Sequence, residues 1–202
     1  MSLIRAPRVT LPAIGVAVLA AALTLSACSG GTTGKSGGGG DTNFVASNGG
    51  ISTVAKGKRV DAPVLSGKDL SGKPLSLADY KGKIIVLNLW GSWCAPCRAE
   101  APYLTKVAKE TKSKGVEFVG INTRDPQTGP ALAFEKEFQV GYPSFHDPSG
   151  KMGLKFPKGS LSLQGIPSTV VVDREGKIAA RALTALDDKQ LHSMIDPLVA
   201  EK

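Results

Sequence analysis

The apolar positions in the C-terminal two thirds of the chain alternate between strand-like and helix-like spacing. Residues 84–89 form a nearly continuous apolar run of six, which predicts a strand covered on both faces. Helical spacing follows over residues 95–114, with Gly115 as the stop, and residues 116–122 predict a second buried strand. These segments predict a strand, a long helix and a second strand in succession.

The remaining elements complete one α/β domain, which we expect to begin at Val60 and to run to Lys202. We predict an N-terminal hairpin (residues 62–65 with 73–77), followed by one helical turn (76–80). We also predict a second long helix (130–138), a C-terminal hairpin (169–172 with 177–181) and a closing helix (187–200). The resulting order predicts three layers, in which a mixed sheet has helices on both faces.

The first 27 residues have the pattern of a secretory signal. Arg5 and Arg8 precede an apolar stretch over residues 9–25, and small residues follow at the cleavage point. A permanent transmembrane helix is the alternative, but the stretch is about 17 residues long, at the lower limit for spanning, and Pro12 interrupts its start. The ending Leu-Ser-Ala-Cys resembles a bacterial lipobox, which implies that Cys28 is acylated and anchors the protein to the membrane by lipid.

Residues 28–59 predict a flexible tether, because Gly, Ser, Thr and Asn in this stretch bury too little surface to fold. The sequence Gly34-Lys35-Ser36 lacks the first glycine and the flanking strand and helix of a phosphate-binding loop. The formal net charge is +8, and removal of Arg5 and Arg8 with the signal leaves 8 − 2 = +6. The lysines are scattered, so we expect no nucleic acid as a partner.

The chemistry-bearing motif is Trp93-Cys94-Ala95-Pro96-Cys97, which follows the first buried strand and opens the long helix. Unpaired backbone N–H groups and the helix dipole at this point favour a Cys94 thiolate, which makes Cys94 the expected nucleophile. Cys97 lies three residues later on the same helical face and can resolve a mixed disulfide. Pro96 fits the first turn, which does not need its N–H.

Three other interpretations of the cysteine pair compete with redox exchange. A structural Cys-x-x-Cys bridge closes too small a loop to stabilise the fold much. A zinc site needs two more ligands, and His146 and His192 lack metal-type spacing, so we expect no metal and no cofactor beyond the redox-active disulfide. A peroxidase on the same fold would carry Pro and Thr at fixed offsets before its cysteine, and residues 90–94 do not.

The segment from Asn88 to Pro102 resembles the active-site segment of the TlpA/ResA-like, membrane-tethered thioredoxin family. Gly82-Lys83, Gly165-Ile166-Pro167-Ser168-Thr169 and Asp173-Arg174-Glu175-Gly176 are also typical of that family. The resemblance spans residues 62–199. It implies a thioredoxin-like fold with an extra N-terminal hairpin and an inserted segment after the second long helix. It also implies a protein disulfide oxidoreductase at the extracytoplasmic face of the bacterial cell membrane.

The resemblance carries several roles to individual residues. Pro167 matches the family's cis-proline, which presents backbone to an extended substrate, so Ile166–Pro167 is the candidate cis bond; an ordinary trans proline is the alternative. Trp93 is expected to cover the disulfide and, with Pro96, Ile166 and Pro167, to contact the substrate. Glu100 matches an acid that tunes the thiols and shuttles protons, the alternative being a solvated helix residue.

Asn88 stands where cytosolic thioredoxins have a buried Asp, and many TlpA-like proteins also have Asn there. The family resemblance implies reduction of protein disulfides, such as those of apocytochrome c during cytochrome maturation, by a monomer that receives electrons from a membrane thiol–disulfide donor. Ala95-Pro96 between the cysteines resembles the reducing members, but some relatives oxidise. The alternatives are a disulfide oxidase or isomerase, a peroxidase, and a non-catalytic binding lipoprotein.

Overall fold

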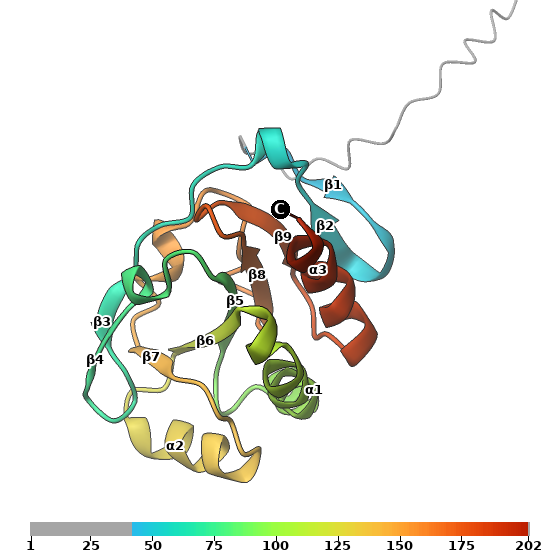
Figure 1. Ribbon diagram of the computed structural model, residues 1–202. Helices are drawn as coiled ribbons and strands as arrows, with labels where there is room; N and C mark the ends of the chain where they lie inside the picture. The colour runs from blue at the N-terminus through green and yellow to red at the C-terminus, as the bar shows by residue number, and fades with distance from the viewer. Residues whose placement is uncertain (1–41, 202) are drawn as a thin grey trace, which may run out of the picture. The chain divides into compact units, whose positions relative to one another are not determined.

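The computed structural model describes residues 42–201 (Figure 1). The predicted signal peptide, Cys28 and the tether as far as residue 41 lie outside the described residues. Within residues 42–201, no helix combines the length and the apolar character needed to cross a membrane.

The described residues form nine strands and three α-helices, with short 3-10 helices between them. The strands are β1 (Val45–Ala46), β2 (Ile51–Thr53), β3 (Ser66–Lys68), β4 (Pro74–Ser76), β5 (Ile84–Trp90), β6 (Val116–Thr123), β7 (Ser144–Asp147), β8 (Ser168–Val172) and β9 (Ile178–Ala182). The helices are α1 (Ala95–Thr111), α2 (Thr128–Glu137), α3 (Asp188–Ala200) and the 3-10 helices η1 (Asn48–Gly50), η2 (Lys56–Lys58), η3 (Leu77–Tyr80), η4 (Lys112–Lys114) and η5 (Gly153–Lys155).

The main sheet has the order β1-β2-β9-β8-β5-β6-β7 and is mixed, while β3 and β4 form a separate hairpin. Strand β5 lies parallel to β6 and antiparallel to β8, and β6 lies parallel to β7. All seven residues of β5 are buried, as the uninterrupted apolar run predicts. The thioredoxin-like α/β fold is therefore confirmed.

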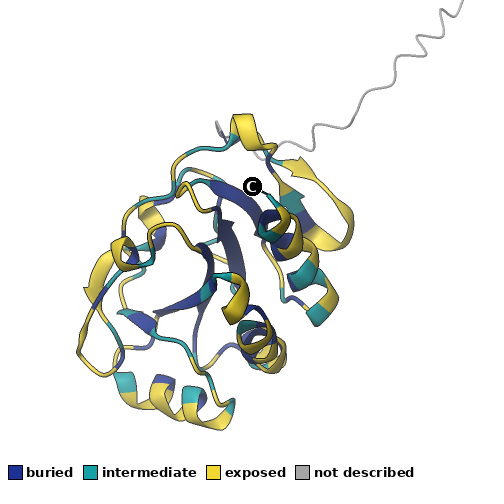
Figure 2. Cartoon of the chain, viewed as in Figure 1, coloured by how far each residue is buried: buried dark blue, intermediate teal, exposed yellow. Residues whose placement is uncertain are grey.

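Successive residues of β5 face opposite sides of the sheet. Ile84 and Val86 pack on one side with Leu104 of α1 and Leu191 of α3. Helix α2 lies on this side too, because its Phe134 stacks on Trp90 with ring centroids 4.3 Å apart. Figure 2 shows the sheet strands largely buried, while the helices expose their outer faces.

The other side of the sheet is covered by the β3–β4 hairpin and the short helices η3 and η5. Leu87 packs there against Leu65, Leu77 and Phe156. The expected layer on this side is thus present, but it is built from a hairpin and 3-10 turns, and all three α-helices pack on the opposite side.

Two differences from the sequence-based expectation concern short strands. The sheet begins before Val60, because β2 pairs with β9 through Ile51 and Ala182 and extends the sheet together with β1. Strand β7 lies in the inserted segment after α2 and was not predicted. Strand β2 carries a single large buried apolar residue, Ile51, and so does β7, Phe145. Neither strand therefore produces a recognisable alternation of apolar and polar residues.

The N-terminal hairpin also differs, since its first strand is residues 66–68 and not 62–65. A side chain at Gly67 would meet Met152 at 2.6 Å, so the absence of one lets the strand approach β7 and η5 closely. The longer elements agree within a few residues. Helix α1 and η4 end at Gly115, whose φ is 78°, and an Asp187–Gln190 capping box starts α3.

Candidate active site

The two active-site cysteines lie where β5 passes into α1, at the N-terminal end of the helix. Cys94 is the N-cap residue, and its sulfur accepts a hydrogen bond of 3.2 Å from the backbone N–H of Cys97. The two sulfurs form a disulfide with an S–S distance of 2.07 Å. Both residues are buried, with 3% of Cys94 and 1% of Cys97 exposed. The helix N-terminus thus directs a backbone donor at the Cys94 sulfur, which stabilises negative charge there.

The segment before β8 forms the second wall of the site. The Ile166–Pro167 peptide bond is cis, as the family resemblance implies, and the alternative of a trans proline is wrong. The carbonyl oxygen of Ile166 lies 3.6 Å from the sulfur of Cys94. Trp93 is 52% exposed beside Cys94, and Pro96 is exposed between the cysteines. Ile166 therefore lies beside Cys94 in space, Trp93 and Pro96 adjoin the cysteines in sequence, and Pro167 follows Ile166 through the cis bond.

Glu100 is buried, with 1% of the residue exposed, so the alternative of a solvated helix residue is wrong. One carboxylate oxygen accepts a hydrogen bond of 2.8 Å from the side-chain amide of Asn88, and the other accepts one of 3.0 Å from the backbone N–H of Leu186. Removal from water raises the pKa of Glu100 to about 7, against the lowering effect of these two bonds. A carboxyl with this pKa exchanges protons at neutral pH.

A cavity of about 10 Å³ lies next to Cys97 and is also lined by Asn88 and Tyr142, among others. Asn88 also donates a hydrogen bond of 3.1 Å to Thr169, so its amide joins α1, β5 and β8. Burial raises the pKa of the Tyr142 hydroxyl, and the negative charge of Glu100 adds to that shift. Asn88 thus lines the same cavity as Cys97 and hydrogen-bonds the carboxylate of Glu100.

Sequence reasoning missed a second hydrogen-bond network, which is centred on Asp125. The buried carboxylate of Asp125 accepts hydrogen bonds from the backbone and hydroxyl of Ser92, at 2.9 and 2.6 Å, and from the amide of Asn122, at 2.6 Å. These bonds fasten the residues before Cys94 to the end of β6. An acid two residues after a buried parallel strand was the available signal, because strand ends line the sites of α/β sheets.

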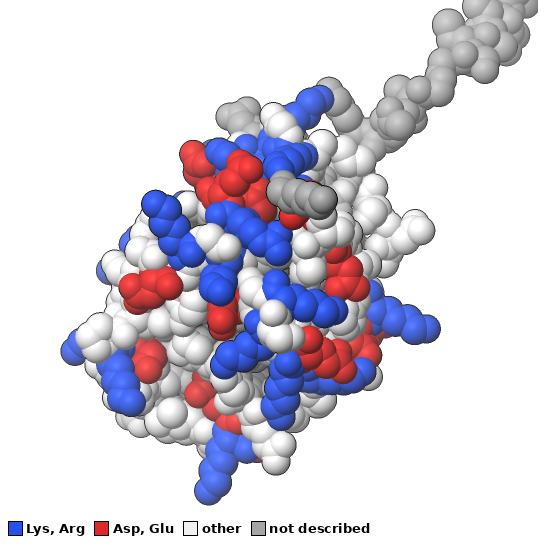
Figure 3. Space-filling view, in the orientation of Figure 1, with Lys and Arg blue, Asp and Glu red and all other residues white. Residues whose placement is uncertain are grey.

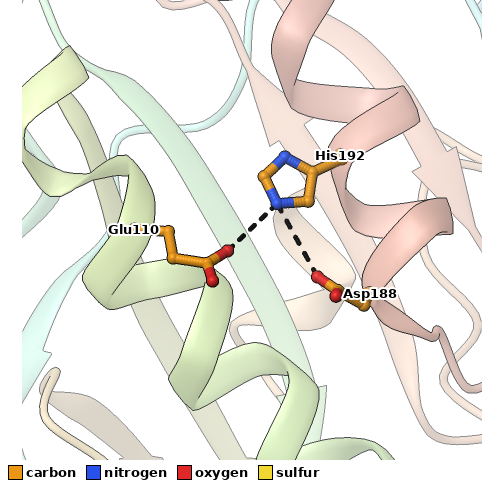
Figure 4. Close-up of side chains that lie close together, drawn as sticks. All are labelled: Glu110, Asp188 and His192. Atoms are coloured by element: carbon orange, nitrogen blue, oxygen red, sulfur yellow. Dashed lines mark hydrogen bonds and ion pairs between the residues drawn. The ribbon is translucent and has the colours of Figure 1, made fainter.

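A different cluster joins α1 to α3. His192 lies 3.2 Å from a carboxylate oxygen of Glu110 and 3.6 Å from one of Asp188 (Figure 4). Lys106 already forms ion pairs with both acids. The cluster therefore contains its own cation, and it holds the C-terminal half of α1 against the start of α3, away from the cysteines.

Two surface features lie apart from the cysteines. A groove of about 450 Å³ at the start of β5 is lined by Tyr80, Ile85 and Val172 and includes neither cysteine. On the face shown in Figure 3, basic and acidic side chains are interspersed without a continuous basic stripe.

Comparison with known proteins identifies the family. Residues 55–195 match the Redoxin family model. The chain is 36% identical to the thiol:disulfide interchange protein HelX of Rhodobacter capsulatus over 73% of its own length and 79% of the relative's. It is 30% identical to the thiol-disulfide oxidoreductase ResA of Bacillus subtilis over 67% and 73% of the two chains.

Two solved structures are similar at the level of sequence and fold. A DsbF homologue from Corynebacterium diphtheriae is 35% identical with a TM-score of 0.69, covering 75% of this chain and 94% of that one. A secreted thiol-disulfide isomerase from Corynebacterium glutamicum is 30% identical with a TM-score of 0.72, covering 81% and 100%. The resemblance to ResA-like thiol–disulfide oxidoreductases is thereby confirmed.

Proposed function

Since the chain belongs to the Redoxin family and its relatives are thiol–disulfide oxidoreductases, we propose that this redox enzyme reduces disulfides of exported proteins through Cys94 and Cys97. The observation that carries the proposal is the placement of Cys94 at the N-cap of α1, bonded to Cys97 and facing the Ile166 carbonyl. Cys94 thus supplies the nucleophile, Cys97 supplies the resolving thiol, and the Ile166 carbonyl offers a backbone acceptor for an extended substrate.

The exchange proceeds in two thiol–disulfide steps. The Cys94 thiolate attacks one sulfur of the substrate disulfide, forms a mixed disulfide and releases one substrate thiolate. Cys97 then loses its proton and attacks the Cys94 sulfur, which closes the enzyme disulfide and releases the second substrate thiolate. Two electrons pass from the enzyme to the substrate. A membrane thiol–disulfide donor restores the reduced pair.

Glu100 accepts the proton that Cys97 loses in the second step. Its carboxyl is buried near the pair and has a pKa of about 7, which suits proton exchange at neutral pH. The cavity beside Cys97 has about the volume of one water molecule, and Asn88 borders it while donating to Glu100. Glu100 thereby takes the place of the buried Asp that Asn88 replaces.

The substrates are proteins outside the cytoplasm, with apocytochrome c the first candidate from the family resemblance of the active-site segment. The enzyme acts as a monomer at the outer face of the membrane, held by lipid on Cys28. A second candidate function is disulfide formation or isomerisation. It is favoured by the likeness to the DsbF homologue and to the secreted isomerase of the two Corynebacterium species.

The reduction potential of the Cys94–Cys97 pair distinguishes the two directions. The protein is equilibrated in glutathione buffers, quenched with acid and alkylated, and its thiols are counted by mass. We expect a potential below about −200 mV, in the range of reducing thioredoxin-like proteins. A value near −120 mV would match strong oxidants and would contradict the proposal.

Activity assays complete the test. The enzyme should reduce insulin faster than it oxidises reduced ribonuclease, and the double variant Cys94→Ser, Cys97→Ser should do neither. Consumption of hydrogen peroxide at a comparable rate would instead favour the peroxidase alternative.

A further inference from the structure

An exposed arginine bridges the two walls of the site. Arg124 directly follows β6 and donates a hydrogen bond of 2.6 Å to the carbonyl of Leu163. Its guanidinium carbon lies 5.3 Å from the centre of the Trp93 ring. Trp93 precedes Cys94, and Leu163 is three residues before Ile166. The guanidinium is therefore fixed between the segments that flank the Cys94 sulfur.

This guanidinium has no acidic partner within residues 42–201. The nearby Asp125 points its carboxylate at Ser92 and Asn122, and no ion pair joins it to Arg124. The other arginine close to the pair, Arg98, is occupied, because its guanidinium bonds both carboxylate oxygens of Glu137. Among the described residues, Arg124 thus supplies uncompensated positive charge and unused N–H donors between Trp93 and Leu163.

The backbone at Arg124 supports a functional reason for its position. Its φ of 58° lies in the left-handed region, which residues other than glycine rarely adopt. The Ser92–Asp125 bonds and the Leu163 carbonyl hold this conformation from both sides. Unfavourable backbone conformations that the surrounding structure maintains concentrate at binding and catalytic sites.

We propose that Arg124 binds a carboxylate side chain of the substrate, so that the enzyme prefers disulfides whose cysteine is flanked by Asp or Glu. The inference rests on the proposed exchange function and names its substrate class. A guanidinium held in place loses little entropy when it pairs with a carboxylate, and its planar donors match two carboxylate oxygens.

The alternative is that Arg124 only fastens residue 163 to Trp93. In that case its loss would slow the exchange of every substrate equally. A carboxylate-binding role instead changes the ratio between acidic and neutral substrates. The ratio also cancels any effect of the Arg124 charge on the reactivity of Cys94.

The test uses three oxidised two-cysteine peptides that differ only in one residue beside the first cysteine, which is Glu, Gln or Lys. Their second-order rate constants with the reduced enzyme are measured by acid-quenched flow and divided by the rates with dithiothreitol, which corrects for intrinsic reactivity. Wild type, Arg124→Gln and Arg124→Lys are compared. Lys189→Gln removes one exposed positive charge on α3 as the matched control.

Wild type should prefer the Glu peptide over the Gln peptide roughly two- to fivefold at low salt, the usual size of a partly exposed ion pair. The preference should fall to about one in Arg124→Gln, be intermediate in Arg124→Lys, persist in Lys189→Gln and weaken in about 0.5 M salt. Equal preference in wild type and Arg124→Gln would overturn the inference alone. Failure of the neutral peptide to exchange at all would overturn the proposed function as well.

Discussion

Replacing Glu100 by Gln should stabilise the protein above pH 7 while changing its stability little at pH 5. The carboxyl of Glu100 is almost fully buried, and its pKa of about 7 in the folded protein exceeds the ordinary value of 4.5. The folded state therefore binds the proton more tightly than the unfolded state. Stability falls as the pH rises from 4.5 to 7, because unfolding then releases the proton, and it stays low above pH 7.

The size of the effect follows from the two pKa values. A difference of 7 − 4.5 = 2.5 corresponds to a total loss of about 3 kcal/mol for wild type, of which about 2.5 kcal/mol falls between pH 5 and pH 8. Gln has the shape of protonated Glu and does not titrate, so Glu100→Gln escapes this loss. Gln cannot accept hydrogen bonds from Asn88 and Leu186 with two oxygens, which costs about 1 kcal/mol at both pH values.

Urea unfolding of the oxidised proteins at pH 5 and pH 8 measures the effect. The free energy of unfolding of Glu100→Gln relative to wild type should rise by about 2–3 kcal/mol from pH 5 to pH 8, which corresponds to a midpoint shift of roughly 1–2 M. The rise should persist in about 0.5 M salt, since desolvation of a buried carboxylate is not screened. Other titrating groups cancel in the difference between the two proteins.

A constant difference at both pH values would refute this reasoning. It would mean that Glu100 is ionised throughout the range and acts only as a hydrogen-bond acceptor for Asn88 and Leu186. The role of proton acceptor for Cys97 would then lose its support, because a carboxyl with an ordinary pKa is a weak base at neutral pH.

Three further predictions concern the cysteines and the α1–α3 cluster. Cys97→Ser should accumulate mixed disulfides through Cys94, whereas Cys94→Ser should accumulate few, as non-reducing gels of cell extracts will show. Cys28→Ala should move the protein out of the membrane fraction, since the proposed lipid attachment site is removed. Burial lowers the pKa of His192, but its acidic neighbours more than offset this effect and raise the pKa above the ordinary value. The charged, ion-paired form of His192 is therefore more populated at pH 6 than at pH 8, so the substitution His192→Asn should reduce stability more at pH 6, as thermal unfolding will measure.

The parts of the site that the sequence predicted depend on local patterns. The pair Cys94 and Cys97 belongs to a short motif between an apolar strand and a helix, and both elements have strong periodicity. The cis bond before Pro167 came from the family resemblance, since sequence spacing alone does not distinguish cis from trans. These features need no knowledge of how distant segments meet.

The parts that were missed depend on contacts between distant segments. Asp125 lies 33 residues from Ser92 in the chain, and Arg124 lies 39 residues from the Leu163 carbonyl that it bonds. The burial of Glu100 depends on the loop that carries Leu186, 86 residues away. Helical spacing places Glu100 near Cys97, but it does not show that a later loop buries the carboxyl almost completely.

Arg124 and Glu100 contact separate parts of the site, so the independence of their effects on exchange can be tested. Arg124 contacts Trp93 and the Leu163 carbonyl, whereas Glu100 contacts Asn88 and the Leu186 N–H, so they share no partner. Sites without shared contacts act additively. The effects of Arg124→Gln and Glu100→Gln on exchange with the Glu peptide should therefore multiply to within about twofold in the double variant at pH 7. A departure of about tenfold would mean that the bound carboxylate and the buried one sense each other across the disulfide, and that substrate recognition and proton transfer are a single coupled process.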